Sequence, residues 1–406
     1  MNIASRIYCR AFQGAFRAAL PFLPYREPEI IHSCDGLKSV FENENIQSVL
    51  VITDKGVAAN GLIAPIERVL NDLGIRFFVY AGTLPNPTVK NVEDALSIYH
   101  RNRCTGLIAI GGGSAMDCAK AVGVRVTYPK RTVNQLGGKL KAWRNLPTLI
   151  AIPTTAGTGS ETTLAAMITD SDTHRKYAIM SFPLIPRYAV LDATLTYSLP
   201  PHLTASTGVD ALTHAVEAYI GRSTTKETRQ LALEATKLVF ENVERAYLDG
   251  KDHEARENML HAAYKAGIAF SKSYVGYIHA LAHALGGRYG TPHGLANAVI
   301  MPYVLEAYGK CVHKKLHQLG IAAGVASEKD DPRTGATKFI RAVKELNAKM
   351  NIPHKLSGIQ KEDIDTLAKH AAKEANPLYP VPKLMTTDEL AAFYVKIADW
   401  SNRNDK

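Results

Sequence analysis

The 406-residue sequence lacks the features that mark several large classes of protein. No apolar run approaches the roughly 20 residues that cross a bilayer, so we expect no membrane span. There is no low-complexity tract and no repeat of solenoid length. Although the net charge is +10, the lysines and arginines are scattered and form no basic stripe with interleaved aromatics. We therefore expect no nucleic-acid partner.

Cysteine is scarce, and the five cysteines show no CxxC spacing. An odd number without paired spacing is typical of reduced thiols, which predicts a cytoplasmic protein. The composition, 46% hydrophobic and 21% charged, is that of a soluble globular protein. A chain of this length is too long for one ordinary core, so two domains are expected.

Residues 1–27 stand apart as an N-terminal extension. They include Arg6, Arg10 and Arg17, and no acidic residue precedes Glu27. Such a segment is either an amphipathic targeting or membrane-surface helix, or a helical extension packed on the body or on a partner subunit. We favour the packed extension, because no small-residue cleavage site follows a proper apolar stretch. A homo-oligomer, a dimer or higher, is expected.

The next part of the chain alternates strand and helix signals. Apolar runs typical of buried parallel strands, and segments with helical spacing between them, predict a doubly wound parallel sheet of Rossmann-like type. The strands are expected at 48–53, 76–80, 106–110, 148–152 and 188–191, with helices at 62–73 and 89–101. Residues 165–169 and 177–180 are expected to form an antiparallel hairpin added to that sheet.

Beyond residue 197 the strand signals stop, and the rest of the chain has the pattern of helices separated by short turns. The predicted fold class is therefore α/β plus all-α. We expect a dinucleotide-binding α/β domain at 28–197 and an all-helical metal-binding domain at 198–406. The active site is expected in the cleft between them, a usual place for catalysis.

A glycine-rich turn at 111–114 joins one predicted strand to a helix that carries Asp117. Gly112 and Gly113 would let the backbone approach a phosphate, and Ser114 lies where the helix offers free N–H groups and its positive dipole end. The turn lacks the third glycine of the GxGxxG pattern, so a plain turn is the alternative interpretation. The motif favours a dinucleotide site.

Two further segments support a dinucleotide. Thr154, Thr155 and Thr158 follow the predicted strand at 148–152, and their small hydroxyl side chains suit contacts to phosphate or ribose. The alternative is a loop with a helix cap. Asp54 ends the first strand, where a carboxylate would accept hydrogen bonds from a ribose and repel a 2′-phosphate, favouring NAD over NADP. The alternative is an aspartate that opens a turn.

One carboxylate and four imidazoles are arranged for a metal site. Asp210 and His214 are four residues apart, as are His279 and His283, so each pair projects from one helix face, and His293 follows nearby. A single such histidine would be a satisfied core residue more often than a ligand. Five candidates exceed the four ligands of a catalytic site, so one has another role. The nitrogen and oxygen set suits Fe(II) or Zn(II).

These motifs together resemble the iron-containing (group III) alcohol dehydrogenases, and the resemblance covers residues 28–400. It rests on Gly-Gly-Gly-Ser with Asp117, on Pro-Thr-Thr-Ala-Gly-Thr-Gly-Ser-Glu at 153–161, on Asp-Ala-Leu-Thr-His, and on His-Ala-Leu-Ala-His with the later Pro-His-Gly. The run Asn-Pro-Leu-Tyr-Pro-Val-Pro at 376–382 is similar to butanol-dehydrogenase-like members. The N-terminal extension lies outside the resemblance.

The resemblance also implies a role for each site residue. The metal ligands would be Asp210, His214, His279 and His293, and His283 would be the non-ligand catalytic histidine beside nicotinamide and substrate. The residues expected to bind the cofactor are Asp54, Asn86, Gly112, Gly113, Ser114, Asp117, Thr154, Thr155, Thr158, Thr163 and Lys176.

The implied reaction is hydride transfer between a primary alcohol, or its aldehyde, and NAD, with Fe(II) or alternatively Zn(II) as a Lewis acid on the substrate oxygen. His283 would relay the alcohol proton to water, since an imidazole exchanges protons near neutral pH. One alternative is a hydroxyacid–oxoacid transhydrogenase or a relative of glycerol dehydrogenase or dehydroquinate synthase. A remote alternative is a non-catalytic filament or assembly role.

Overall fold

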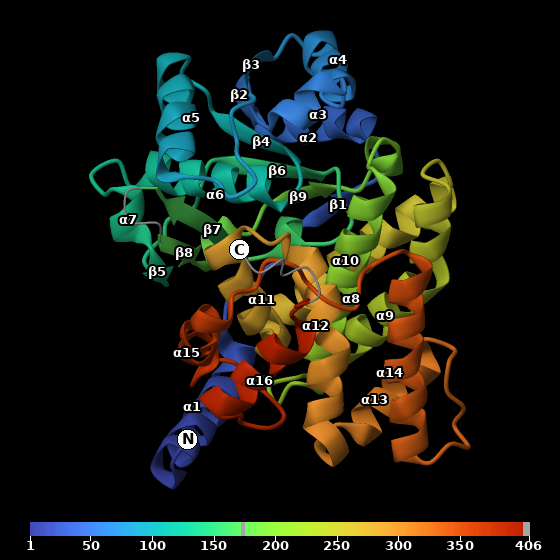
Figure 1. Ribbon diagram of the computed structural model, residues 1–406. Coiled ribbons are helices and arrows are strands. Elements are labelled where there is room, and N and C mark those ends of the chain that lie inside the picture. The colour runs from blue at the N-terminus through green and yellow to red at the C-terminus, as the bar shows by residue number, and fades with distance from the viewer. Residues whose placement is uncertain (172–174, 401–406) are drawn as a thin grey trace, which may run out of the picture. The chain divides into compact units, whose positions relative to one another are not determined.

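The computed structural model describes residues 1–171 and 175–400 (Figure 1). By its internal contacts the chain divides into two compact units. The α/β unit is Pro24–Leu199, and the helical unit joins Met1–Leu23 to the part of the chain that begins at Pro200. The domain limits expected from sequence at 27/28 and 197/198 stay a prediction.

The α/β unit contains, in the part of the chain that is described, a six-stranded sheet in the order β1-β9-β6-β4-β2-β3. Every neighbouring pair is parallel. The strands are β1 (Glu29–Ile31), β2 (Ser48–Ile52), β3 (Arg76–Tyr80), β4 (Gly106–Gly111), β6 (Thr148–Pro153) and β9 (Tyr188–Val190). The predicted parallel α/β fold is confirmed.

The central strands are largely apolar because both faces of the sheet are covered. On β2, Leu50 and Ile52 belong to a core with α5 (Val89–Arg101) and α6 (Gly113–Thr127). The alternate residues Val49 and Val51 belong to a second core with α2 (Leu37–Glu44) and α4 (Ala64–Asp72). The side-chain period of two thus splits one strand between two cores.

A second, three-stranded sheet in this unit has the order β5-β8-β7. The predicted hairpin forms, because β7 pairs antiparallel with β8, but it is not added to the parallel sheet as expected. The tip of the hairpin at 172–174 lies outside the described residues. The other elements of the unit are α2 (Leu37–Glu44), α3 (Lys55–Ala59), α4 (Ala64–Asp72), α7 (Val133–Leu136), β5 (Gly138–Lys139), β7 (Ala165–Asp170) and β8 (Arg175–Met180).

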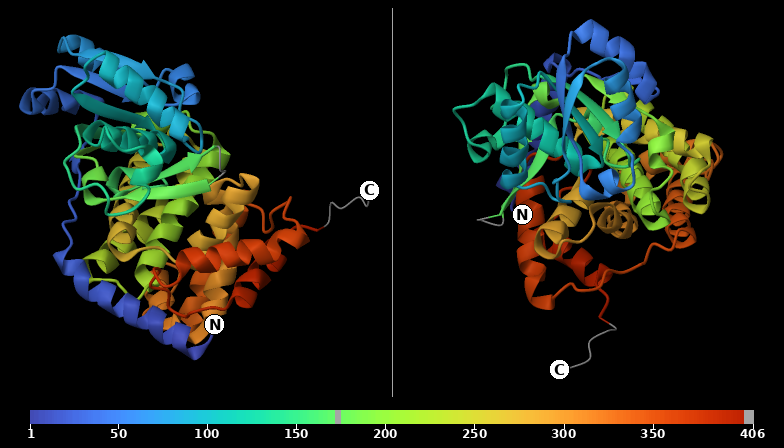
Figure 2. Two further views of the ribbon diagram at one scale, coloured as in Figure 1. Left: turned by 90° about the vertical axis from the view of Figure 1, so that its left-hand side faces the viewer. Right: turned by 90° about the horizontal axis from the view of Figure 1, so that it is seen from above.

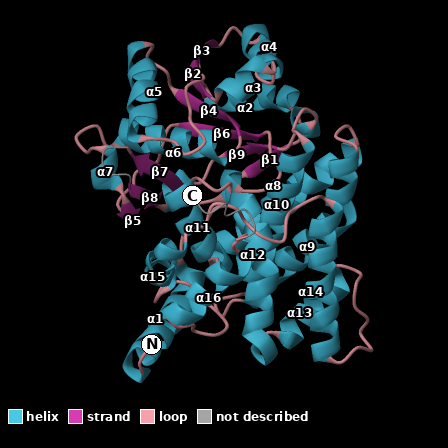
Figure 3. Cartoon of the chain, in the orientation of Figure 1, coloured by secondary structure: helices cyan, strands magenta, loops and turns pink. Residues whose placement is uncertain are grey.

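The helical unit holds none of the named strands of the described chain, as Figure 3 shows by colour. Its central helix is α8, which is buried on almost every side and packs against α9, α10 and α12. None of the described helices is both long enough and apolar enough to cross a membrane. The helices are α1 (Ile3–Ala19), α8 (Pro201–Ile220), α9 (Lys226–Leu248), α10 (His253–Ser273), α11 (Tyr277–Tyr289), α12 (His293–Tyr308), α13 (His313–Ala322), α14 (Pro332–Lys349), α15 (Ile364–Ala375) and α16 (Thr387–Ile397).

Candidate metal centre and cofactor segments

Three helices of the helical unit supply one group of metal-ligating side chains. Each member offers one ligand atom, and these atoms all lie within 4.8 Å of one another. The four members, which we call the ligand cluster, are Asp210 and His214 of α8, His279 of α11 and His293 of α12. All four were expected from the sequence as metal ligands.

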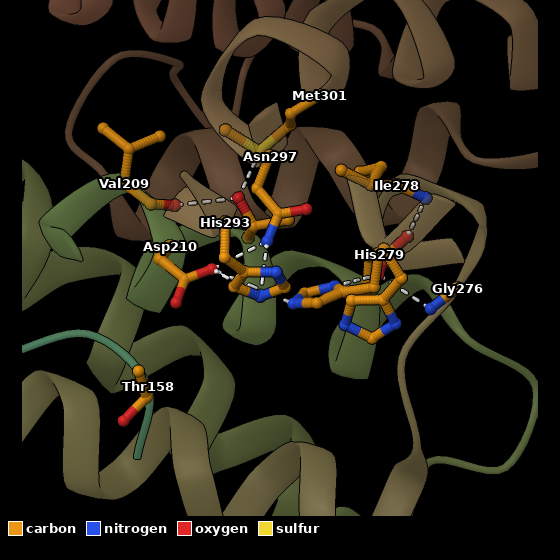
Figure 4. Close-up of polar contacts among 12 residues, drawn as sticks. Thr158, Val209, Asp210, Gly276, Ile278, His279, His293, Asn297 and Met301 are labelled. Carbon is orange, nitrogen blue, oxygen red and sulfur yellow. Dashed lines mark hydrogen bonds and ion pairs between the residues drawn. The ribbon is translucent and has the colours of Figure 1, made fainter. Parts of the chain in front are cut away.

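The geometry of the ligand cluster centres on one carboxylate oxygen. Asp210 Oδ1 lies 3.4 Å from His293 Nε2 and 4.0 Å from His279 Nε2. The rings of His214 and His279 stack with their centroids 4.4 Å apart. Figure 4 shows Asp210, His279 and His293 from three different helices gathered at this point.

Helix α12 begins with the pair His293-Gly294, and the glycine allows this helix to approach α8. A Cβ atom on Gly294 would lie 2.3 Å from the carbonyl oxygen of Ser206 and 3.3 Å from Cβ of Asp210. Any side chain there would push the start of α12 away from α8. The glycine after His293 therefore helps to bring that imidazole to Asp210.

The ligand cluster fits a divalent transition metal. His279 is 2% exposed, and its Nε2 has no hydrogen-bond partner among the described residues. Burial, followed by the neighbouring histidines, lowers the pKa of His279 well below its ordinary value, so the ring stays neutral with a lone pair to offer. One carboxylate and three imidazoles form a set of ligands suited to Fe(II) or Zn(II).

A buried glutamate that was not predicted as a site residue holds His279. Glu217 Oε2 lies 2.7 Å from His279 Nδ1 and accepts from Gly276 N at 2.7 Å, while Oε1 accepts from Ile278 N at 2.8 Å. Burial raises the pKa of Glu217 to about 7, and hydrogen bonds from the backbone N–H groups of Gly276, Ile278 and His279 oppose the rise. A Cβ on Gly276 would lie 2.6 Å from Oε1, so glycine is needed for this contact. Glu217 lies one helical turn after His214 on α8.

Asn297 is a second residue that the sequence did not single out. Its amide nitrogen donates to Asp210 Oδ1 at 2.7 Å and lies 3.1 Å from His293 Nε2 (Figure 4). Asn297 is one helical turn after His293, so both side chains project from the same face of α12. The amide orients the carboxylate and the imidazole relative to each other.

The fifth candidate, His283, does not belong to the ligand cluster. Its Nδ1 lies 2.6 Å from Oε1 of Glu374 on α15. The same carboxylate oxygen accepts a hydrogen bond from the hydroxyl of Tyr379 at 2.7 Å. The ring of His283 stacks on that of His293 with centroids 5.0 Å apart. His283 therefore lies beside the candidate metal centre with its Nδ1 held by a carboxylate. Neither Glu374 nor Tyr379 was predicted.

The residues expected to bind a cofactor lie largely at the carboxyl ends of parallel strands. Asp54 follows β2, the glycine-rich turn follows β4, and Thr154 and Thr155 follow β6. The connections after β2 and β4 run to opposite faces of the sheet, since α4 and α6 belong to different cores. Adjacent strands of this kind form a topological switch point, where open α/β sheets bind ligands.

Glycines permit close packing at this edge of the sheet. A Cβ on Gly113 would lie 3.0 Å from the side chain of Thr158, and one on Gly112 would lie 3.6 Å from that of Thr155. The two segments expected to hold the dinucleotide are therefore brought together. Gly112 is the N-cap of α6 and has no side chain that could accept hydrogen bonds from the first N–H groups of this long helix. These N–H groups are therefore left for a ligand.

Three more of the expected residues lie close together in this unit. Lys176 Nζ donates to Asn86 Oδ1 at 2.8 Å, and Ser114 Oγ donates to Pro85 O at 2.5 Å. These contacts tie β8, the turn after β3 and the start of α6 together. The three side chains thus come from distant parts of the sequence to one place.

Asp117 and Thr163 are occupied by a buried network around Lys120, which was not predicted. Lys120 Nζ donates to Thr163 Oγ1 at 2.7 Å and to Ser160 O at 2.6 Å. Ser160 Oγ donates in turn to Asp117 Oδ1 at 2.9 Å. Burial lowers the pKa of Lys120 to about 8. The ammonium thereby fixes the segment that carries the expected cofactor-binding residues.

Asp54 has a structural task as well as its expected one. Its Oδ1 accepts from Val57 N at 3.0 Å, so it caps α3. Its other oxygen faces the glycine turn, since a Cβ on Gly111 would lie 3.4 Å from Oδ2. A helix cap and a ribose contact through the second oxygen are compatible.

Comparison with known proteins covers both units. The sequence matches iron-containing alcohol dehydrogenase over residues 31–193 and the C-terminal part of the Fe-containing alcohol dehydrogenase family over residues 204–398. Alcohol dehydrogenase 4 of Saccharomyces cerevisiae (strain YJM789) is 38% identical over 361 residues, 88% of this chain and 93% of that protein.

Solved structures agree with the sequence matches. The crystal structure of 1,3-propanediol oxidoreductase has a TM-score of 0.88 and 32% identity, and the match covers 92% of this chain and 99% of that one. Sulfoacetaldehyde reductase from Bifidobacterium kashiwanohense, in complex with NAD+, has a TM-score of 0.81 and 27% identity, with 92% and 98% covered. An identity of 38% across most of the chain reflects more than a common fold. The chain belongs to the iron-containing alcohol dehydrogenase family and is an oxidoreductase.

Proposed function

We propose that this protein is a metal-dependent alcohol dehydrogenase, or aldehyde reductase, that transfers a hydride between a primary alcohol and NAD. The observation that carries the proposal is the ligand cluster, whose four ligand atoms converge within 4.8 Å in a chain of an iron-containing family. The buried Nε2 of His279 has no hydrogen-bond partner among the described residues, and a bound cation would compensate for its burial.

The four residues of the ligand cluster would hold Fe(II), with Zn(II) as the alternative, and leave a coordination position for substrate. When bound, the metal supplies Lewis-acid polarisation of the substrate oxygen. Asp210 contributes the negative charge of the site, and Asn297 holds the Asp210 carboxylate in place. Glu217 keeps the proton of His279 on Nδ1, so that Nε2 faces Asp210 and His293.

The cofactor would be NAD, with NADP as the less favoured alternative. It supplies or accepts the hydride at its nicotinamide ring. The residues proposed to bind it are Asp54, Asn86, Gly112, Gly113, Ser114, Asp117, Thr154, Thr155, Thr158, Thr163 and Lys176. Support comes from the convergence of these segments at the carboxyl edge of the sheet and from a relative that was solved with NAD+. Asp54 is the residue that would disfavour a 2′-phosphate.

His283 is proposed as the catalytic histidine that exchanges the alcohol proton with water. It lies beside His293, its side chain is 27% exposed, and its Nδ1 is held by Glu374. A ring held at one nitrogen presents the other in a fixed direction. The proton leaving the alcohol can therefore pass to a base with access to solvent.

The partner is proposed to be a small alcohol or aldehyde rather than a nucleic acid. We also propose a homo-oligomer and a cytoplasmic location. Size-exclusion chromatography with light scattering would test the first, and fractionation of the source cells would test the second.

The test of the proposed function uses protein stripped of metal with a chelator and reloaded separately with Fe(II) and Zn(II). NADH formation is then measured with a panel of short primary alcohols and diols. The proposal expects NADH only from reloaded protein, with a preference among substrates and little activity with NADP. No formation of reduced nucleotide with any combination of alcohol, metal and nucleotide would contradict the proposed function. Turnover without net NADH, and with retained nucleotide, would indicate the transhydrogenase instead.

A further inference from the structure

The N-terminal helix α1 contacts an irregular segment that includes Tyr379. The hydroxyl of Tyr379 donates to Glu374, the carboxylate that meets His283. This segment, residues 376–382, follows α15, and we call it the connecting segment. Figure 2 shows α1, in dark blue, against the C-terminal part of the chain in red. The helix precedes residue 31, where the family match begins.

Gln13 is the central contact of α1. The residue is 4% exposed, and its amide nitrogen donates to Tyr379 O at 2.7 Å and to Pro377 O at 3.2 Å. Carbonyl groups of an irregular segment have no regular partner of their own and need such donors. Gln13 therefore fixes the backbone on both sides of residue 378.

Arg10, one turn earlier on α1, extends this contact along the connecting segment. Its guanidinium donates to Val381 O at 2.8 Å, to Pro382 O at 3.0 Å and to Oε1 of Gln13 at 2.8 Å. Arg10 thus orients Gln13 and fixes the next carbonyls in the chain. The two side chains together hold four carbonyl groups of the connecting segment, those of residues 377, 379, 381 and 382.

The side chain of Tyr379 carries the contact onward. The residue is 8% exposed, and its hydroxyl donates to Glu374 Oε1, the same oxygen that meets His283 Nδ1. The ring of Tyr379 lies near that of Tyr274, with centroids 6.4 Å apart. Tyr274 in turn makes an edge-to-face contact with Phe16 of α1, with centroids 5.0 Å apart. Both the backbone and the ring of Tyr379 are therefore connected to α1.

We propose that α1 is a positioning element for His283, acting through Gln13, Tyr379 and Glu374. The inference rests on the proposed role of His283 as the catalytic histidine. Glu374 is held by two groups, and its position decides the direction of the His283 ring. If Tyr379 shifts, the carboxylate and the imidazole move with it.

The contacts of α1 are not those of a helix that only buries apolar surface. Ile3 and Ile7 of α1 are 77% and 65% exposed, whereas the buried residues of the helix are Cys9 and Gln13. The polar contacts of α1 are hydrogen bonds to backbone carbonyl groups. Because hydrogen bonds are directional, they fix the orientation of the connecting segment as well as its distance from α1. A positioning role predicts an effect on the rate of reaction that exceeds any effect on binding.

The test compares the double variant Arg10→Ala/Gln13→Ala with the matched control Arg6→Ala on the same helix. In the metal-loaded protein the double variant should lower kcat by about 10- to 100-fold, since small displacements of a reacting group have costs of this size. KM for the alcohol, the metal content and the activity of Arg6→Ala should not change. In the metal-free protein, amides of the connecting segment should exchange hydrogen faster in the double variant alone.

A second comparison separates positioning from general stability. In a His283→Ala background the double variant should cause no further loss of kcat, because the group that it positions is gone. Should the double variant fail to fold, Gln13→Met and Tyr379→Phe replace it, since both keep the side-chain size and lose only hydrogen bonds. Each should lower kcat in the parent and not in the His283→Ala background.

Two results would overturn the inference, and they differ from failure of the proposed function. Equal losses of kcat with and without His283 would show that α1 acts on the whole unit. Unchanged kcat in every α1 variant, with a large loss in His283→Ala, would show that His283 is positioned without α1. A His283→Ala variant with full activity would instead contradict the proposed role of His283 itself.

Discussion

Helix α11 carries two histidines one turn apart, and each meets a glutamate from another helix through Nδ1. The inner pair is His279 with Glu217, at 2.7 Å, and the outer pair is His283 with Glu374, at 2.6 Å. The side chains of the inner pair are 2% and 1% exposed, whereas those of the outer pair are 27% and 34% exposed. The two pairs therefore share their chemistry and differ in their surroundings.

This difference in burial suits the two roles proposed for these histidines. Burial keeps His279 neutral and leaves its Nε2 without a hydrogen-bond partner among the described residues, so a cation would be a suitable partner for this nitrogen. His283 lies next to the same centre but is open to solvent, where a histidine can exchange protons with water. We therefore predict that two histidines one turn apart on α11 act as ligand and as proton carrier, because the first is buried and the second is partly exposed.

The strongest test of the inner pair is His279→Ala. Loss of this ligand should release the metal and lower kcat/KM by about 10³-fold or more, because Lewis-acid polarisation is worth several kcal/mol. Metal content after dialysis and turnover with the best alcohol are the measurements. His202→Ala, an exposed histidine of α8 outside the ligand cluster, is the control. A His279→Ala protein that keeps its metal would contradict the assignment.

His283→Ala tests the outer pair and should have the next largest effect. We expect the metal content to stay that of the parent while kcat falls by about 10²-fold, the usual size of a general acid–base contribution. Metal analysis and steady-state kinetics on the same preparation decide the point. If the metal is lost here as well, the two pairs do not differ in role as burial suggests.

Glu217→Gln sharpens the comparison through metal affinity. The amide would keep an oxygen for the backbone N–H of Ile278 but present an NH2 group to that of Gly276 and to His279 Nδ1, so the ring would lose its orientation. Metal affinity should fall by about 10- to 100-fold, as for other carboxylates that orient a ligand histidine. Competition with a chromophoric chelator measures the affinity. Glu374→Gln is the matched control and should leave affinity unchanged.

Much of the fold was predictable because its signals are local. The expected segments 76–80 and 89–101 coincide with β3 and α5, and the buried runs at 48–53 and 106–110 with β2 and β4, apart from one terminal residue each. Strand β1 was not predicted, since three residues give no periodicity to detect. The separate three-stranded sheet was missed because strand pairing depends on contacts between distant segments.

The candidate site also contains residues that local sequence spacing predicts and residues that only distant contacts reveal. Spacing of four residues places two candidates on one helix face, so the ligand cluster could be assembled from sequence and family resemblance. Its role as the metal site stays a prediction. Glu217 and Glu374 lie 62 and 91 residues from the histidines that they hold, so only the folded chain reveals these partners. Glutamates of this kind are common on helix surfaces and carry no sequence signal of their own.

The smallest predicted effect concerns the acid stability of the outer pair. Burial alone would raise the pKa of Glu374, but His283 and the hydrogen bonds from His283 and Tyr379 hold it below its ordinary value. The folded state therefore favours the ionised carboxylate. This stability is complete above the unfolded pKa of about 4.3 and is lost as pH falls through the lower folded pKa.

Urea unfolding of the metal-free protein between pH 3.5 and about 7 measures this contribution. Glu374→Gln should be less stable than the parent at neutral pH, and the difference should shrink as the pH falls below about 4.3. Glu362→Gln, at an exposed position just before α15, is the control and should follow the parent at every pH. A constant difference between Glu374→Gln and the parent would mean that the carboxylate stabilises the outer pair by its shape and not by its charge. The inner and outer histidine–glutamate pairs would then differ in burial alone.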